Sequence, residues 1–331
     1  MRKVGGKRSK GRMLAQVWQA FRQLNPKNVD EESRRTIRVG MVGDINLLQD
    51  SAAHLLGEDL QAYDEAGDTL ILLTTPLEQA AFSLLPRCDA LLLSFDYTDT
   101  LPGVATERIF RFSSTDDLGP AVRAILREPE LSYLHLPFAR ALPAFRRDVA
   151  SEIIQGVSIE NAVFTASTSL GNIIPNPLQP LASVAESLGD LVVLTANQMR
   201  MLFRLAAAYD QDMGYKQQVP EVLTILAAAF GWRSLARELV SKAPFGAGIV
   251  PKSAIAFAGT WAIGDGIVYY YTTGKRLTKQ EMAEHFEAAY DRGKEAAEVI
   301  VCKLKEVYAK RTSGKENPLP GSGSGGSEAP S

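Results

Sequence analysis

The spacing of apolar residues divides the chain into two parts. Between residues 37 and 137, short apolar runs alternate with stretches of helical spacing. Short apolar runs favour β-strands, and strands separated by helices pair in parallel through crossover connections. We expect strands at IRVGMV (37–42), TLILLT (69–74), ALLLSF (90–95), RIFRFS (108–113) and YLHL (133–136). We expect helices at LLQDSAAHLL (47–56), PLEQAAFSLL (76–85) and LGPAVRAILRE (118–128).

Beyond residue 138 the strand signals stop and the spacing becomes helical. Thr278 followed by Glu281 fits a capping box, in which the two side chains satisfy backbone amides at a helix start. The predicted helices are 139–169, 181–212, 220–242, 250–272 and 278–310. The predicted fold class is therefore α/β plus all-α. A small, doubly wound parallel sheet, either degenerate G-domain-like or Rossmann-like, precedes a hydrophobic helical bundle with hairpins.

Four segments follow from this pattern. Residues 1–36 form a basic arm with an amphipathic helix at MLAQVWQAFRQL (13–24), after which Pro26 interrupts the helical spacing. Residues 37–137 form the α/β module, and residues 138–311 form the helical domain. Residues 312–331 are rich in glycine and serine, which predicts a disordered tail. The first twelve residues carry six basic side chains and no acid, namely Arg2, Lys3, Lys7, Arg8, Lys10 and Arg12.

Composition excludes several classes of protein. The chain has 331 residues and a net charge of -2, which argues against a strongly basic nucleic-acid binder. The two cysteines, Cys88 and Cys302, are too far apart for a CxxC motif and too few for a disulfide scaffold. No secretory signal is expected, because the N-terminus lacks an apolar segment followed by a small-residue cleavage site.

The loop after the first strand is the candidate site for a phosphate. Ligands of parallel sheets bind at the carboxyl ends of the strands, so any nucleotide would contact Gly40, Gly43, Asp44 and Asn46. A P-loop requires GxxxxGK followed by Ser or Thr, and this loop has no lysine and places Asp44 where phosphates would approach. The alternative interpretation is that Gly43 serves turn geometry alone.

Other chemical motifs give no stronger signal. Residues 116–119 match DxxG, a pattern that arises often by chance, and NKxD is missing. The three histidines, His54, His135 and His285, stand in no metal or catalytic motif, so each is interpreted as a surface or core side chain. We therefore predict no catalytic residue, no metal site and no cofactor, and expect a protein that is not an enzyme.

The helical region resembles the YcjF-type family of bacterial proteins, a domain of unknown function. The resemblance covers about residues 150–300 and is carried by Asn197 and Gln198 on an apolar helix, RLAAAY (204–209), LAREL (235–239) and the small-residue segment 246–266. It implies a helical domain commonly assigned to membranes and often joined to a GTPase domain. The family has no enzymatic motif to transfer, so the resemblance assigns no catalytic residue.

A membrane location is the expectation that follows. The 22-residue run over residues 253–274 is long enough to cross a bilayer, although Asp265 interrupts its apolar character. The basic arm can bind anionic lipid headgroups. We expect the bacterial cell membrane, with the N-terminal module in the cytoplasm, and otherwise a cytoplasmic location.

The predicted function is that of a non-enzymatic, membrane-associated scaffold or regulator. Membrane lipid is the expected partner, and a GTPase or a second copy of the chain is the candidate protein partner; nucleic acid is not expected. One alternative is a GTPase-like, nucleotide-binding switch with a non-standard phosphate loop. The other alternative is a soluble helical adaptor.

Overall fold

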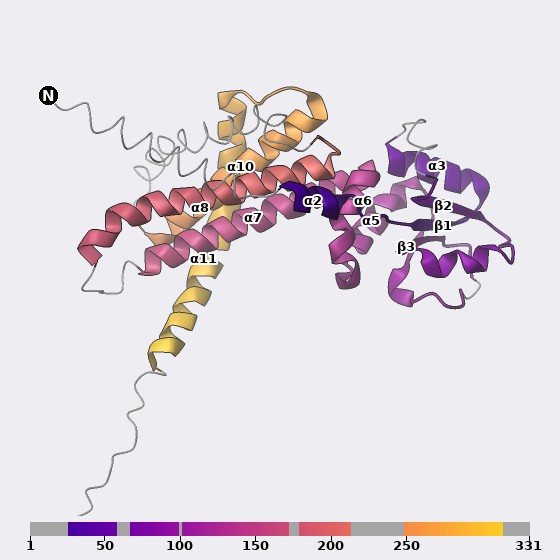
Figure 1. Ribbon diagram of the computed structural model, residues 1–331, viewed down its shortest axis with the longest axis horizontal. Helices are drawn as coiled ribbons and strands as arrows, with labels where there is room; N and C mark the ends of the chain where they lie inside the picture. Colours follow the sequence, from indigo (N-terminus) through magenta and orange to yellow (C-terminus); the bar gives the residue numbers. More distant parts are fainter. Residues whose placement is uncertain (1–25, 58–66, 99–100, 172–178, 213–247, 314–331) are drawn as a thin grey trace, which may run out of the picture.

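The computed structural model describes residues 26–57, 67–98, 101–171, 179–212 and 248–313. Within these ranges, a parallel sheet lies at one end of the molecule and long helices lie at the other (Figure 1). The expected layout of an α/β part followed by a helical part is therefore confirmed. The helices predicted at 13–24 and 220–242 lie outside the described residues, as does most of the predicted tail.

Four of the five predicted strands are present. They are β1 (Val39–Gly43), β2 (Leu70–Thr74), β3 (Ala90–Ser94) and β4 (Ile109–Phe112). All pairings are parallel, and the order across the sheet is β2-β1-β3-β4. Every residue of β1 and β3 is buried, as expected for central strands covered on both faces.

The two faces of the sheet are covered differently. On one face, α3 (Ile45–Leu56) and α5 (Leu118–Arg127) join the main core. On the other face, two short 3₁₀ helices, η1 (Ala81–Ser83) and η2 (Leu85–Arg87), cover a smaller apolar cluster. The α-helix predicted over residues 76–85 is therefore wrong. Pro86 lies inside η2, where it has no amide to donate and disfavours the α conformation of the residue before it.

The strand predicted at residues 133–136 is also wrong. This segment lies in η5 (Pro129–Leu134) and α6 (His135–Ala141). Leu131, Leu134 and Phe138 are all at most 3% exposed. Their spacing of three and four residues is that of a helix face, and it becomes visible only over a window longer than four residues.

Long helices form the second part of the molecule. They are α7 (Pro143–Gly171), α8 (Gln179–Ala208), α10 (Ile249–Thr273) and α11 (Lys279–Ser313). The predicted capping box at the start of α11 is confirmed. The Glu281 amide donates to Thr278 Oγ1 at 3.2 Å, and the Thr278 amide donates to Glu281 Oε2 at 2.7 Å.

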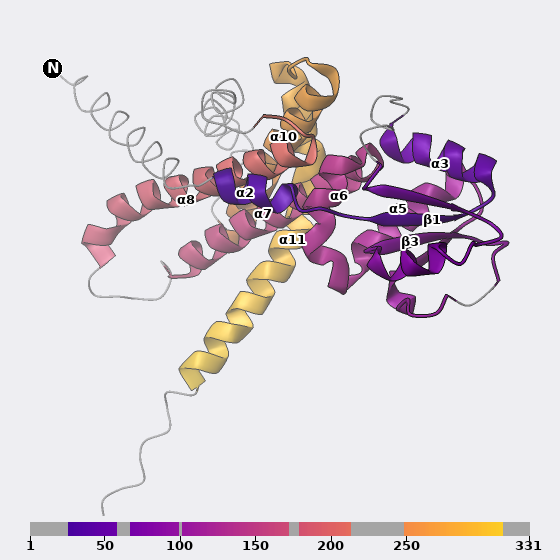
Figure 2. The same ribbon diagram turned by 45° about the vertical axis from the view of Figure 1, so that its right-hand side comes forward.

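A short helix, α2 (Pro26–Ser33), precedes the sheet and contacts α6 and α8 (Figure 2). The sequence pattern predicted that Pro26 ends the preceding helix, which lies outside the described residues; α2 begins at this proline and was not predicted. Proline is favoured at the first helical position, because its ring fixes the required backbone angle and its missing amide would be unpaired anyway.

One hydrophobic core runs through both parts. It includes Met41 and Leu92 of the sheet, Phe138 of α6, Leu205 of α8 and Ile263 of α10, all at most 1% exposed. The domain boundary predicted between residues 137 and 138 falls inside α6 and stays a prediction. Because the core is continuous, the sheet and the helices are held together by the same apolar contacts.

None of the helices within the described ranges is long and apolar enough to cross a membrane. The spanning helix expected over residues 253–274 is thus not found. It corresponds to α10, in which Ala258, Ala262 and Ile263 are at most 1% exposed because they pack against other helices.

Two helical glycines provide a matched test of this packing. A Cβ on Gly264 of α10 would lie 2.5 Å from Ile154 Cγ1 of α7, whereas a Cβ on Gly156 of α7 would meet nothing within 4 Å. We expect Gly264→Ala to lower the free energy of unfolding by about 1–3 kcal/mol through overpacking. Gly156→Ala should raise it by about 0.5–1 kcal/mol through helix propensity. Urea denaturation measures both, and equal effects would contradict the close contact of α7 with α10.

Candidate functional site

The carboxyl edge of β1 and β3 is the place where this topology would bind a ligand. After β2 the chain reverses its direction across the sheet, so the connections that leave β1 and β3 diverge there. Open α/β sheets bind ligands at such a reversal point. In this structure two loops meet at that edge, one at Gly43 and Asp44 and the other after Ser94.

Asp44 already occupies the helix terminus that a phosphate would use. Its carboxylate Oδ1 accepts a hydrogen bond from the Asn46 amide at 2.9 Å, which makes Asp44 the N-cap of α3. The amides and the dipole of a helix N-terminus favour an anion, and here the anion is a side chain of the same chain. A phosphate would have to displace or approach this exposed carboxylate.

The two glycines of the predicted loop have packing roles. A Cβ on Gly40 would lie 2.4 Å from Leu91 Cδ2 and 2.9 Å from Cys88 Sγ, so Gly40 lies within the sheet packing and away from the loop. A Cβ on Gly43 would lie 3.1 Å from Ser94 Cβ. The structure thus brings Gly43, Asp44 and Asn46 together at the loop but leaves Gly40 apart.

The interpretation of Gly43 as a turn residue is wrong. The glycines with positive φ among the described residues are Gly57, Gly103 and Gly274. Gly43 therefore does not use the backbone freedom that distinguishes glycine in turns. Its lack of a side chain serves the approach of β1 to β3 instead.

Polar side chains form hydrogen bonds along the rest of this edge. Arg111 Nη1 donates to the Tyr97 carbonyl at 2.9 Å and so ties β4 to the loop after β3. Asp117, within the DxxG match, accepts hydrogen bonds from the backbone and the hydroxyl of Ser113. This match is therefore a turn at the start of α5. Among the described residues, no group of three or more His, Cys, Asp or Glu side chains is suitable for a metal ion.

Cys88 packs in the smaller apolar cluster of the sheet, and its thiol has low reactivity as a nucleophile. Burial and the neighbouring Asp89 raise the pKa of its thiol to about 11. A thiol with such a pKa is protonated at neutral pH, and the thiolate is the reactive form. Its position against Gly40 indicates a packing role.

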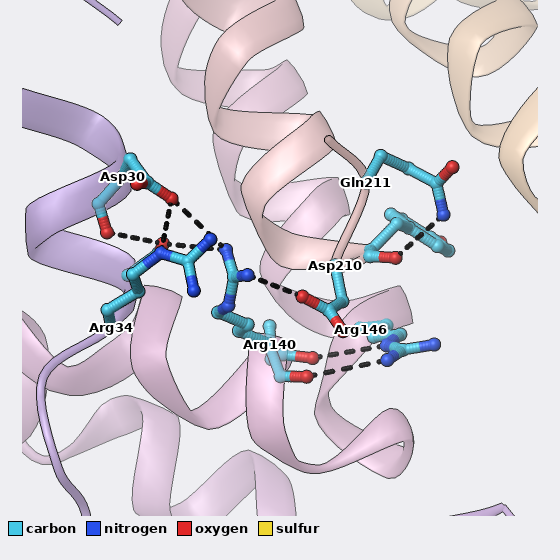
Figure 3. A network of polar contacts seen from close by, with 9 residues as sticks. Asp30, Arg34, Arg140, Arg146, Asp210 and Gln211 are labelled. Atoms are coloured by element: carbon cyan, nitrogen blue, oxygen red, sulfur yellow. Dashed lines mark hydrogen bonds and ion pairs between the residues drawn. The ribbon is translucent and has the colours of Figure 1, made fainter. Parts of the chain in front are cut away.

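A second polar cluster joins α2 to the helical part, and Figure 3 shows it. We name it the arginine clasp: Asp30, Ser33, Arg140 and Asp210. Arg140 Nη2 lies 2.6 Å from Asp210 Oδ1, and its Nη1 lies 3.1 Å from Ser33 Oγ and 3.6 Å from Asp30 Oδ1. The Arg140 side chain is 15% exposed, so these partners replace most of its hydration.

The clasp ties α2 to α6 and to the residues just after α8. Ser33 is the buried residue of α2, and Val29 packs partly buried against the core. Because α2 buries so little apolar surface, a shielded polar contact contributes substantially to its attachment. Residues 30, 140 and 210 are far apart in the sequence and lie in no motif, so sequence reasoning did not find this cluster.

The neighbouring Arg146 side chain caps the C-terminal end of α6. Its Nε donates to the Ala139 carbonyl at 3.2 Å, where the last carbonyls of a helix have no partner within the helix. Burial lowers the pKa of Arg146, and the nearby Asp210 and Tyr209 oppose this shift. The guanidinium also lies over the Tyr209 ring, 6.0 Å from its centroid.

A third polar cluster lies inside the helical bundle. Asn161 of α7 donates through Nδ2 to Thr260 Oγ1 of α10 at 2.8 Å, and both residues are 0% exposed. From α8, Asn197 donates to Asn161 Oδ1 at 2.9 Å and Gln198 donates to Thr260 Oγ1 at 3.3 Å. The two amides noted on an apolar helix are therefore interhelical hydrogen-bond donors.

Two of the three histidines form pairs with acids between helices. His135 Nδ1 of α6 lies 2.9 Å from Glu152 Oε2 of α7. His285 Nδ1 of α11 lies 2.9 Å from Asp265 Oδ2 of α10. Asp265, the acid within the apolar run, thus has its partner on the next helix. The interpretation of these histidines as surface or core side chains missed that each joins two helices.

The clasp gives a testable prediction within one network. We expect Arg140→Ala to lower the free energy of unfolding by about 1–3 kcal/mol, because it removes charge-assisted hydrogen bonds that are largely shielded from water. Arg34 also contacts Asp30, but its side chain is 60% exposed. Arg34→Ala should therefore cost less than about 1 kcal/mol. Chemical denaturation compares the two, and equal losses would show that Arg140 does not hold α2.

The pair of His135 and Glu152 gives a pH dependence. The hydrogen bond with His135 lowers the pKa of Glu152, burial opposes the shift, and the positive charge of Arg204 adds to the lowering. A lowered carboxyl pKa stabilises the fold above the ordinary glutamate value of about 4.3, and this stabilisation is lost as the pH falls through the folded-state pKa. Wild type should therefore exceed Glu152→Gln in stability at neutral pH, and the difference should shrink towards about pH 3.

Urea denaturation across this pH range is the measurement for the Glu152 pair. Glu295→Gln, at an exposed position of α11, is the control and should change stability little at any pH. A difference between wild type and Glu152→Gln that does not change with pH would count against the pair.

Comparison of the chain with protein families, with curated proteins and with solved structures gave no match. The resemblance to the YcjF-type family consequently has no support at the level of a family and stays a hypothesis.

Proposed function

We propose that the protein is a non-enzymatic, membrane-associated scaffold. In this proposal the sheet module is a degenerate relative of a nucleotide-binding fold, G-domain-like or Rossmann-like, and the helical part is of the YcjF type. The observation that carries the proposal is the hydrogen bond of 2.9 Å from the Asn46 amide to the Asp44 carboxylate at the start of α3.

This hydrogen bond opposes phosphate binding in two ways. It uses an amide that would otherwise point at the ligand, and it fixes a negative charge at the place where phosphate oxygens would lie. The P-loop lysine that balances phosphate charge has no equivalent in this loop. The nearby cation Arg111 is engaged with the carbonyl of Tyr97. The local charges therefore favour a loop that keeps its shape without a ligand.

The core supports the role of a scaffold. Buried residues of one cluster extend from Met41 in β1 through Phe145 in α7 to Leu205 in α8. A partner that binds the sheet module would consequently be held at a fixed position relative to the helices. The candidate protein partners of such a scaffold are a GTPase or a second copy of the chain.

The basic arm supports membrane association. Residues 1–12 carry six cations and no acid, and anionic lipid attracts such a segment with about 1 kcal/mol per basic residue near the surface. The arm precedes α2 in the sequence, and the arginine clasp attaches α2 to the bundle. The proposed location is the cytoplasmic face of the bacterial cell membrane.

Calorimetric titration tests the nucleotide half of the proposal. We expect no heat of binding when GTP or ATP is added to the full chain, and Asp44→Ala should not create binding. Loss of the N-cap should lower the stability of Asp44→Ala by about 1 kcal/mol, while Asp50→Ala on the exposed side of the same helix should be nearly neutral. Micromolar binding to the wild type, lost when Asn46→Pro removes the loop amide, would overturn the scaffold and favour a nucleotide switch.

Cell fractionation tests the membrane half. The full chain should be recovered with the membrane fraction and should be released by high salt, because surface attraction between charges is screened. Complete recovery in the soluble fraction at low salt would favour a soluble helical adaptor.

A further inference from the structure

The apolar stripe of α11 continues past the part of the bundle that covers it. Over the earlier turns of the helix the stripe is buried against α10 and α7, with Phe286, Ala289, Ala297 and Val301 all at most 5% exposed. Val301 is the last residue of α11 that is buried among those described. The stripe then continues at the same helical spacing through residues 304 and 307.

The antiparallel register of α10 and α11 explains why α10 does not cover the later residues of α11. A Cβ on Gly266 would lie 2.8 Å from Met282 Cε near the hairpin turn, and one on Gly293 would lie 2.9 Å from the Ala254 carbonyl. The two helices therefore run antiparallel, and α10 begins at Ile249. Later residues of α11 consequently lie beyond the start of α10. Figures 1 and 2 both show this end of α11 leading away from the other helices.

We name residues 302–313 the α11 overhang. At about 1.5 Å per residue it extends roughly 18 Å. Leu304 is half-buried, and Val307 is 48% exposed. The overhang thus presents apolar side chains that the described part of the chain covers only in part.

The charges of the overhang indicate what kind of surface it meets. Lys303 and Lys305 are exposed, and their positions on the helical wheel are on either side of Leu304. Glu306 is the single acid in the sequence of the overhang, and its position on the wheel is on the side away from Leu304. Apolar side chains flanked by cations are typical of helices that lie in the headgroup region of an anionic membrane.

We propose that the α11 overhang is a membrane contact that binds anionic lipid headgroups, with Leu304 and Val307 entering the interface and Lys303 and Lys305 meeting the headgroups. This inference rests on the proposed membrane association and adds to the basic arm a second point of contact.

A second copy of the chain fits the overhang less well. Pairing of two stripes would bring the flanking lysines of one copy beside those of the other, and like charges that flank a helix seam oppose pairing. The exposed part of the stripe is also small. Among the overhang residues whose side chains the structure describes, it consists of Leu304 and Val307, which supply far less than the surface of about 800 Å² per partner in a stable interface.

Co-sedimentation of the full chain with vesicles tests the inference. The vesicles contain either phosphatidylcholine alone or phosphatidylcholine with phosphatidylglycerol. We expect binding to the anionic vesicles, and a loss of about tenfold in the apparent partition constant for Leu304→Gln/Val307→Gln, since each side chain contributes apolar transfer energy. Lys303→Gln/Lys305→Gln should lose about as much at low salt. The matched control is Cys302→Gln, an exposed position of the same segment off the stripe, and it should bind like the wild type.

The outcomes separate this inference from the function on which it rests. A variant with the six basic residues of the arm changed to glutamine should bind weakly but still depend on Leu304 and Val307. If the overhang variants bind like the wild type while the arm variant does not, the overhang inference is overturned and membrane association stands. If the wild type binds neither kind of vesicle, both are overturned. A concentration-dependent dimer lost in Leu304→Gln/Val307→Gln would assign the stripe to a second copy and overturn the lipid contact.

Discussion

The helical part depends on the hydrogen bonds that Thr260 makes with Asn161 and Gln198. Amides and hydroxyls buried among apolar side chains cost free energy unless they are paired, and these are paired only in one register of α7, α8 and α10. Close approach of the backbones at Gly264 has the same effect, because a shift of α10 along α7 would move this glycine away from Ile154. Packing and polar pairing thus select the same arrangement of helices.

This constraint explains why the helical region resembles membrane sequence. A helix buried on several sides by other helices is apolar around much of its circumference, as a helix in lipid is. The distinguishing signals are single polar residues such as Asp265, and their meaning depends on the partner. In the sequence Asp265 stands alone in an apolar run, whereas in the fold it pairs with His285, twenty positions later. The pattern along one helix cannot reveal a partner on another.

Sequence pattern predicted local structure well where the cause is local. The four strands of the sheet, the helices after β1 and β4, and the capping box at Thr278 follow from apolar spacing and from bonds between residues close in the chain. The pattern failed where the cause is distant. Residues 133–136, which belong to the amphipathic helical segment 131–138, were interpreted as a strand. Helix α2 was missed although Arg140, more than a hundred positions away, helps to hold it. For the candidate site, the loop itself was predictable, but the N-cap role of Asp44 and the packing role of Gly40 depend on contacts that only the fold brings together.

The hydrogen bonds of the loop after β1 stabilise the sheet when no ligand is bound. A nucleotide site needs unpaired amides and a spare cation, and both are features that raise the free energy of the empty fold. Here the Asn46 amide is paired with Asp44, and Arg111 is paired with a carbonyl. The sheet is therefore stabilised by contacts that a ligand would have to break.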